Sequence, residues 1–113
     1  MTLPAKLNDL IEFDPATLRV ASRESSSKEF KQTLDRNAFA VYAKSLVAFS
    51  NSKGGMLLYG ITDKQRRICG IDPAQIPDEA QWTDFLRNHF EPVIDFDTKT
   101  YEVSDTHVYA VFC

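Results

Sequence analysis

The stretch of sequence that decides the fold runs from Ala48 to Asp63 and reads AFSNSKGGMLLYGITD. Its centre, MLLYGI at residues 56–61, is apolar without polar alternation, which predicts a central strand buried on both faces. Gly54 and Gly55 supply the tight or left-handed backbone that a helix-to-strand corner requires. We therefore interpret four residues as structural turn positions: Asn51, Gly54, Gly55 and Gly60. For Asn51, Gly54 and Gly55 the alternative is a ligand-binding loop.

On the N-terminal side of this stretch, a clear helical pattern ends at Asn51, and Asp35 or Asn37 is suited to cap its start. The apolar stripe has i, i+3, i+4, i+7 spacing and consists of Phe39, Tyr42, Ala43, Leu46, Val47 and Ser50. Residues 18–34 are ambiguous, because Ser26 to Glu29 fits a capping box opening a helix. The same segment equally fits a strand with Phe30 directed inward.

The two flanks of the chain complete the expected fold. Leucines and Ile11 at helical spacing predict a short amphipathic helix over residues 3–12. On the C-terminal side we expect a hairpin strand at 67–71, and then a helix over 79–90 that is capped by Asp78. The core face of that helix consists of Trp82, Phe85, Leu86 and Phe90. After the helix we expect three strands, at 92–97, 100–104 and 107–113, joined by turns at 98–99 and 105–106. The pattern predicts an α+β fold with a mixed central β-sheet and two or three helices packed on it.

The chain has 113 residues, enough for one domain spanning 1–113. No apolar run approaches the roughly 20 residues of a membrane span, and no secretory signal is visible. Cys69 and Cys113 are too few for a disulfide framework, so we expect a cytoplasmic protein. The last residues read as a core strand that reaches the C-terminus. We therefore expect the N-terminal part of a longer protein, truncated at its C-terminal strand.

The net charge of −3 hides an uneven distribution. Residues 19–67 carry ten Lys or Arg against four Asp or Glu, a net charge of +6, whereas residues 68–113 carry two against nine, a net charge of −7. Such asymmetry indicates a charged partner. The overall acidity alone would have argued against nucleic acid.

Three motifs occur together in this basic region and directly after it. They are ESSSKEFK at residues 24–31, the stretch at 48–63 quoted above, and ICGI at 68–71. In this order and spacing they resemble the AlbA-type domain of the Schlafen family, over about residues 22–71. Ser50 stands where the family usually has Ala, and Lys53 where it usually has a short polar residue. After residue 71 the resemblance is only one of secondary-structure pattern.

The resemblance implies two functions. Bacterial members are described as DNA-binding or transcriptional-regulator modules and have been labelled divergent AAA domains, whereas animal members include metal-dependent endoribonucleases with three carboxylates. Those carboxylates fall on Glu24, Glu29 and Asp63. Three carboxylates suit Mg²⁺ or Mn²⁺, which could activate water for phosphodiester cleavage. For the five-residue spacing of Glu24 and Glu29 to work, Ser25–Ser27 must turn the chain, and Asp63 must lie beside both.

Each carboxylate also has an ordinary structural interpretation. Glu29 could complete the capping box, Glu24 could be a solvated surface charge, and Asp63 lies at a turn position that favours Asp. The phosphate-binding sequence G-x-x-x-x-G-K-[ST] is absent, so nothing in these residues supports ATP hydrolysis.

The basic residues support a binding function, because Lys and Arg on one face neutralise phosphates. The candidates for nucleic-acid binding are Arg23, Lys28, Lys31, Lys53, Lys64, Arg66 and Arg67. We therefore expect a nucleic-acid-binding domain of a bacterial transcriptional regulator, with DNA or RNA as partner, no membrane and no cofactor needed for binding. The first alternative is an endoribonuclease that uses Mg²⁺ or Mn²⁺. The second is a protein-interaction module that forms a homodimer.

Overall fold

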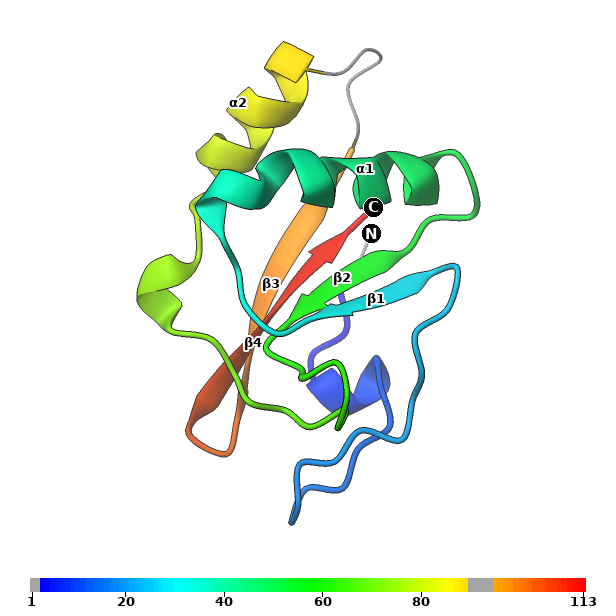
Figure 1. Ribbon diagram of the computed structural model, residues 1–113, viewed down its shortest axis with the longest axis vertical. Helices are drawn as coiled ribbons and strands as arrows, with labels where there is room; N and C mark the ends of the chain where they lie inside the picture. Colours follow the sequence, from blue (N-terminus) through cyan, green and yellow to red (C-terminus); the bar gives the residue numbers. More distant parts are fainter. Residues whose placement is uncertain (1–2, 90–94) are drawn as a thin grey trace.

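The computed structural model describes residues 3–89 and 95–113, and its centre is one four-stranded sheet. The strands are β1 (Lys28–Lys31), β2 (Met56–Tyr59), β3 (Asp97–Val103) and β4 (Thr106–Phe112). Their order is β1-β2-β4-β3, with β1 and β2 parallel and the other neighbours antiparallel (Figure 1). The sheet is therefore mixed, and the expected α+β class is confirmed.

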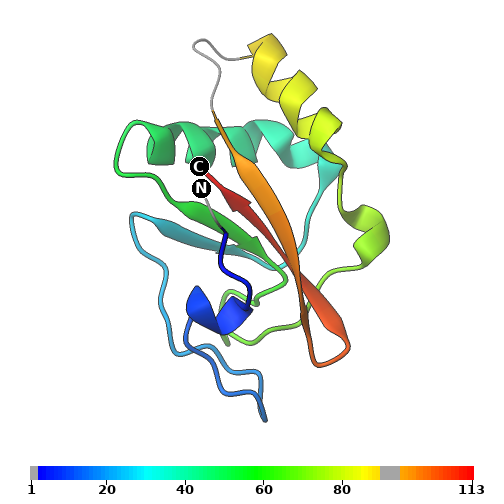
Figure 2. The ribbon, with the colours of Figure 1, turned by 180° about the vertical axis from the view of Figure 1, so that it is seen from behind.

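Strand β2 lies inside the sheet and is covered on both faces, as its apolar run predicts. Leu57 and Tyr59 belong to one hydrophobic cluster and Leu58 to another, and all three are fully buried. Helices α1 (Phe39–Ser50) and α2 (Glu79–His89) pack on the first cluster. Figure 2 shows the opposite face, where the N-terminal segment and the 3₁₀ turn η1 (Leu7–Asp9) cover the second cluster.

Helix α1 follows most of its predicted stripe, since Phe39, Tyr42, Ala43 and Leu46 are buried on the sheet side. Val47 is only half-buried and Ser50 is exposed, whereas Phe49, which the predicted stripe left out, is buried. Asp35 caps the 3₁₀ turn η2 (Arg36–Ala38) that leads into the helix, by accepting a 2.9 Å hydrogen bond from the backbone N–H of Asn37. The helix ends at Asn51 as expected.

Helix α2 begins with a reciprocal cap. The carboxylate of Asp78 accepts from the Gln81 backbone N–H, and the Gln81 amide oxygen accepts from the Asp78 N–H, each at 3.0 Å. Trp82 is fully buried, stacks on Phe39 with ring centroids 4.5 Å apart, and donates its indole N–H to the hydroxyl of Tyr109 at 3.0 Å. The expected cap and core face are confirmed, although Phe90 lies outside the described residues.

Four sequence expectations need correction. The helix expected over residues 3–12 is only the three-residue turn η1, because so short a helix is marginal and its apolar residues find cover without it. The turn expected at 98–99 lies inside β3, which pairs with β4 throughout. The actual hairpin turn is Ser104-Asp105, both at positive φ, one residue before the expected position. Residues 67–71 form no strand but only isolated bridges, and the start of the expected strand at 92–97 lies outside the described ranges.

The two-faced core makes a direct prediction about α1. Leu46→Ala should lower the free energy of unfolding by about 2–5 kcal/mol, because Leu46 is fully buried against the sheet. The matched control is Val41→Ala on the same helix, which should change the free energy of unfolding by less than about 0.5 kcal/mol because Val41 is 54% exposed. Urea unfolding at pH 7 measures both, and equal losses would contradict this assignment of the buried face.

Candidate functional site

The segment before β1 turns sharply at its serines. Ser25 and Lys28 exchange backbone hydrogen bonds, at 3.0 Å from the Ser25 N–H and 3.4 Å from the Lys28 N–H. The Ser27 N–H also donates to the Ser25 hydroxyl at 3.2 Å. Residues 28–31 are a strand, so the strand alternative holds and no capping box forms. The expected chain reversal at Ser25–Ser27 is present, and it brings Glu24 back beside β1.

Glu24 and Asp63 meet beside the end of the parallel strand pair. Asp63 is close enough to act on the Glu24 carboxyl group both through its charge and as a hydrogen-bonding neighbour, and the backbone N–H of Phe30 acts on the same group from β1. Partial burial raises the pKa of Glu24, and the negative charges of Asp63 and Glu29 raise it further, against the lowering effect of the Phe30 N–H.

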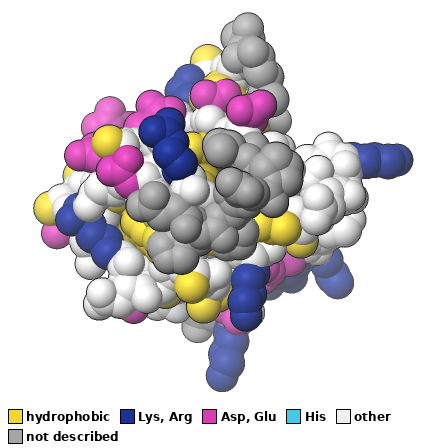
Figure 3. Space-filling view, turned by 90° about the horizontal axis from the view of Figure 1, so that it is seen from above, with side chains coloured by type: hydrophobic (Ala, Val, Ile, Leu, Met, Phe, Trp, Pro, Cys, Tyr) yellow, Lys and Arg dark blue, Asp and Glu magenta, His cyan; other side chains and the backbone are white. Residues whose placement is uncertain are grey.

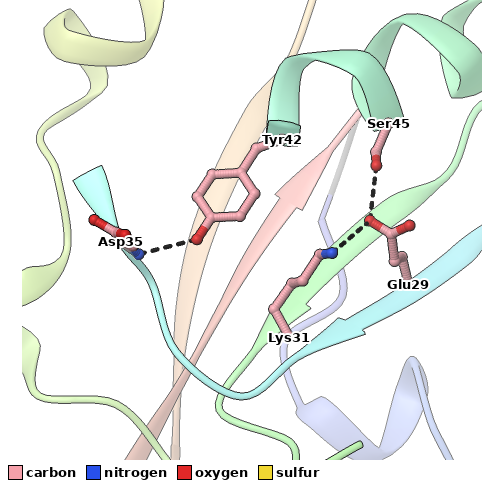
Figure 4. Close-up of polar contacts among 5 residues, drawn as sticks. All are labelled: Glu29, Lys31, Asp35, Tyr42 and Ser45. Carbon is pink, nitrogen blue, oxygen red and sulfur yellow. Dashed lines mark hydrogen bonds and ion pairs between the residues drawn. The ribbon is translucent and has the colours of Figure 1, made fainter. Parts of the chain in front are cut away.

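Glu29 is held on the helix side of the sheet. Its carboxylate accepts a 2.7 Å hydrogen bond from the Ser45 hydroxyl on α1 and lies 3.5 Å from the Lys31 ammonium (Figure 4). Lys31 and Glu29 share a strand face, as the i, i+2 spacing predicts. Across the described residues, no three Asp, Glu, His or Cys side chains are placed to hold a metal ion. Glu29 is close enough for its charge to act on Glu24, but its own carboxylate is engaged by Ser45 and Lys31. The three-carboxylate metal site therefore stays a prediction.

Three of the predicted basic residues come together with one that sequence reasoning did not single out. Lys64, Gln65, Arg66 and Arg67 line an open depression of about 450 Å³ together with Arg19. The backbone fixes this arrangement, because Arg19 and Arg67 form an antiparallel bridge and the Val20 N–H donates to the Arg66 carbonyl at 2.7 Å. Arg19 was missed because nothing local to it shows that residues 18–20 lie against 66–68.

The remaining predicted basic residues lie apart from this depression. Lys53 is exposed in the loop before β2, at the opposite end of that strand from Lys64. Lys28 begins β1, Lys31 pairs with Glu29, and Arg23 is exposed just before the serine turn. Figure 3 views the molecule from above, and on that face the Lys and Arg side chains stand apart while Asp and Glu side chains gather on one side.

The turn residues serve the backbone. Gly54 has a φ of +87° and donates to the Phe49 carbonyl at 2.9 Å, which closes the corner after α1. Gly55 exchanges backbone hydrogen bonds with Cys113, which extends the β2–β4 pairing, and a Cβ there would lie 2.6 Å from the Phe49 ring. Gly60 has a φ of +106° at the end of β2. This geometry is what a helix-to-strand corner and a strand exit require.

A buried group of tyrosines lies between the sheet and α1. Tyr42 accepts a hydrogen bond from the Asp35 N–H at 2.9 Å (Figure 4), whereas the buried hydroxyl of Tyr59 has no partner among the described residues. Burial raises the pKa of Tyr59, and Tyr42, Tyr109 and the charge of Glu29 add to the effect. Tyr59 is therefore a neutral phenol and belongs to the core.

The fold and this charged strand end define a small α+β domain with an acidic pair and a basic depression. In a comparison with known protein families, the family model described as "Schlafen, AlbA_2" matches residues 24–113. The chain belongs to the Schlafen AlbA_2 family, and the match extends well past residue 71. Within the described ranges, neither helix has the length and apolar composition needed to cross a bilayer.

One curated relative is an uncharacterized ATP-binding protein from Ureaplasma parvum serovar 3, 34% identical over 89 residues. The aligned region is 77% of this chain but 25% of the relative, so this chain spans about a quarter of that protein.

Two solved structures share the fold. The DIP2311 protein from Corynebacterium diphtheriae has a TM-score of 0.60 at 21% identity, covering 87% of this chain and 20% of that one. The N-terminal domain of a RecG-related protein from Nitrosomonas europaea, named for an ATP-dependent DNA helicase, has a TM-score of 0.50 at 22% identity. That match covers 81% of this chain and 65% of the other.

The acidic pair predicts a pH-dependent gain in stability for Glu24→Gln. A carboxyl group whose folded-state pKa is raised weakens folding above that pKa, and the cost disappears as the pH falls and the group binds its proton. At pH 7, glutamine removes the repulsion while keeping a donor for Asp63, so the urea midpoint should rise. This gain in the urea midpoint should shrink as the pH is lowered through the folded-state pKa of Glu24 toward 4.5, the ordinary pKa of a glutamate side chain.

The control for this measurement is Asp84→Asn. Asp84 is exposed on α2, so its substitution should leave the urea midpoint nearly unchanged at pH 7 and at pH 4. A midpoint for Glu24→Gln that falls at pH 7, or a gain that persists undiminished at pH 4, would contradict the close placement of Glu24 and Asp63.

Proposed function

We propose that this domain binds DNA or RNA through the phosphate backbone. The observation that carries the proposal is the unpartnered positive charge beside the end of β2. Among the described residues, Lys31 is the only Lys or Arg whose side chain lies within 4 Å of a carboxylate, so Arg19, Lys64 and Arg67 are exposed cations without a protein counter-charge. Such side chains release condensed counterions when they neutralise phosphates.

The comparisons support this direction. The chain belongs to the Schlafen AlbA_2 family, for which the sequence resemblance implies DNA-binding modules among bacterial members, and one structure of the same fold is the N-terminal domain of a RecG-related protein. The chain covers a quarter of its curated relative, so we propose that it works as one module of a longer bacterial regulator. Phosphate contacts require no cofactor, and on their own they position a nucleic acid without reading its sequence.

Binding across a salt series tests the proposal. Fluorescence anisotropy with labelled single-stranded and duplex DNA and RNA should show saturable binding at 50 mM salt. The logarithm of the association constant should fall linearly with the logarithm of salt concentration, by about 0.9 per phosphate neutralised on duplex DNA. No detectable binding to any of the four probes at 50 mM salt would reject the proposal.

A second candidate function is metal-dependent RNA cleavage, favoured by the contact between Glu24 and Asp63. Against it stands Glu29, whose carboxylate is occupied by Ser45 and Lys31. We therefore rank this function below binding.

The test of cleavage is incubation of structured RNA with Mn²⁺ or Mg²⁺. If the domain is a nuclease, Glu29→Ala and Asp63→Ala should each reduce cleavage at least about 100-fold, while Glu102→Ala, an exposed carboxylate on β3, should not. Cleavage that is equal in wild type and all variants would identify a contaminating nuclease.

A further inference from the structure

The depression at the 62–67 turn brings several positive charges together, although neighbouring like charges lower the stability of the folded state. Arg19 and Arg67 are directly opposed in an antiparallel bridge, so their side chains leave the same face of the chain pair. Like charges placed opposite each other in this way are destabilising. Lys64 and the half-buried Arg66 line the same depression, and no acidic residue lines it.

The backbone holds the depression in place. The Thr62 N–H donates to the Arg67 carbonyl at 2.8 Å, and the Arg67 N–H donates to the Thr62 hydroxyl at 3.0 Å. The Ile68 N–H donates to the Leu18 carbonyl at 2.8 Å, which ties the turn to the segment that carries Arg19. Asp14 lines a neighbouring depression with Arg19 and Arg66 but lies within ion-pair distance of neither. The charge is thus both concentrated and unneutralised.

We propose that this depression is a phosphodiester-binding subsite, with Arg19 and Arg67 binding the non-bridging oxygens of one backbone phosphate. This inference rests on the proposed nucleic-acid binding and assigns it to a place. Arginine suits the role, because its planar fork of N–H donors matches the geometry of a phosphate. Lys64 and the Gln65 amide supply further donors at the rim. The lining holds no aromatic ring on which a base could stack, so the ligand is a phosphate and not a nucleobase.

The test is the double variant Arg19→Gln/Arg67→Gln, measured against Lys44→Gln/Arg87→Gln. The control removes the same charge from exposed positions outside the depression. On duplex DNA the first variant should weaken binding roughly ten-fold or more at 50 mM salt and reduce the salt slope by about 0.9, the value for one phosphate, whereas the control should reduce the slope by less than about 0.5.

A structural readout accompanies the binding measurement. Removing the opposed charges should raise the melting temperature of Arg19→Gln/Arg67→Gln at low salt, and the gain should vanish at 1 M salt, where charges are screened. A lower melting temperature at low salt would mean that the two arginines stabilise the turn, and it would overturn the argument that they await a ligand.

The outcomes separate this inference from the proposed function. If the wild-type domain binds no probe, the function itself fails. If the wild-type domain binds and both double variants lose affinity equally, binding is spread over the surface and the subsite is wrong while the function stands. Competition with ATP and with inorganic phosphate at constant ionic strength separates the sources of phosphate. Displacement by millimolar ATP that is abolished in Arg19→Gln/Arg67→Gln would assign the depression to free nucleotides and overturn the proposal.

Discussion

The burial of β2 on both faces is the constraint on which the rest of the structure depends. Leu57 and Tyr59 point to one side and Leu58 to the other, and none is exposed. A strand with two apolar faces must be covered twice, because each large apolar side chain left in water costs roughly 1.5–3 kcal/mol. The helices α1 and α2 supply one cover and the N-terminal segment supplies the other.

That constraint also decides where charge can accumulate. Residues 62–67 follow shortly after β2, whose buried positions are occupied by apolar side chains and tyrosine. The charged and polar side chains therefore lie in the turn after the strand, where they reach solvent. The Glu24–Asp63 pair and the depression of Arg19, Lys64, Gln65, Arg66 and Arg67 adjoin along the chain without forming an ion pair. In the proposed complex, the basic side attracts the phosphate backbone and the acidic pair repels it, so the two together would orient a bound strand.

Secondary structure was predicted correctly where a local sequence pattern specified it. It was predicted wrongly where pairing with a segment distant in the sequence determined the conformation. The stripe of α1, the Asp78 cap and the unalternated run of β2 are local patterns, and each is present in the structure. Thr98 and Lys99 have turn-like neighbours, yet pairing with β4 keeps them in a strand. Of the predicted basic residues, Lys64, Arg66 and Arg67 share one depression, and Lys53 lies at the other end of β2.

The sequence by itself determined the class of the fold, the core strand with its glycine corner, and the family to which the chain belongs. These follow from apolar periodicity, from the glycines at the corner and from the order and spacing of the motifs, all of which can be read directly from the sequence. Only the tertiary structure decided that Glu29 turns to Ser45 while Glu24 meets Asp63, and that Arg19 joins the basic turn. The paired residues are between 16 and about 48 positions apart in the sequence. Their contacts depend on how two distant segments pack together, and no local sequence pattern specifies that packing.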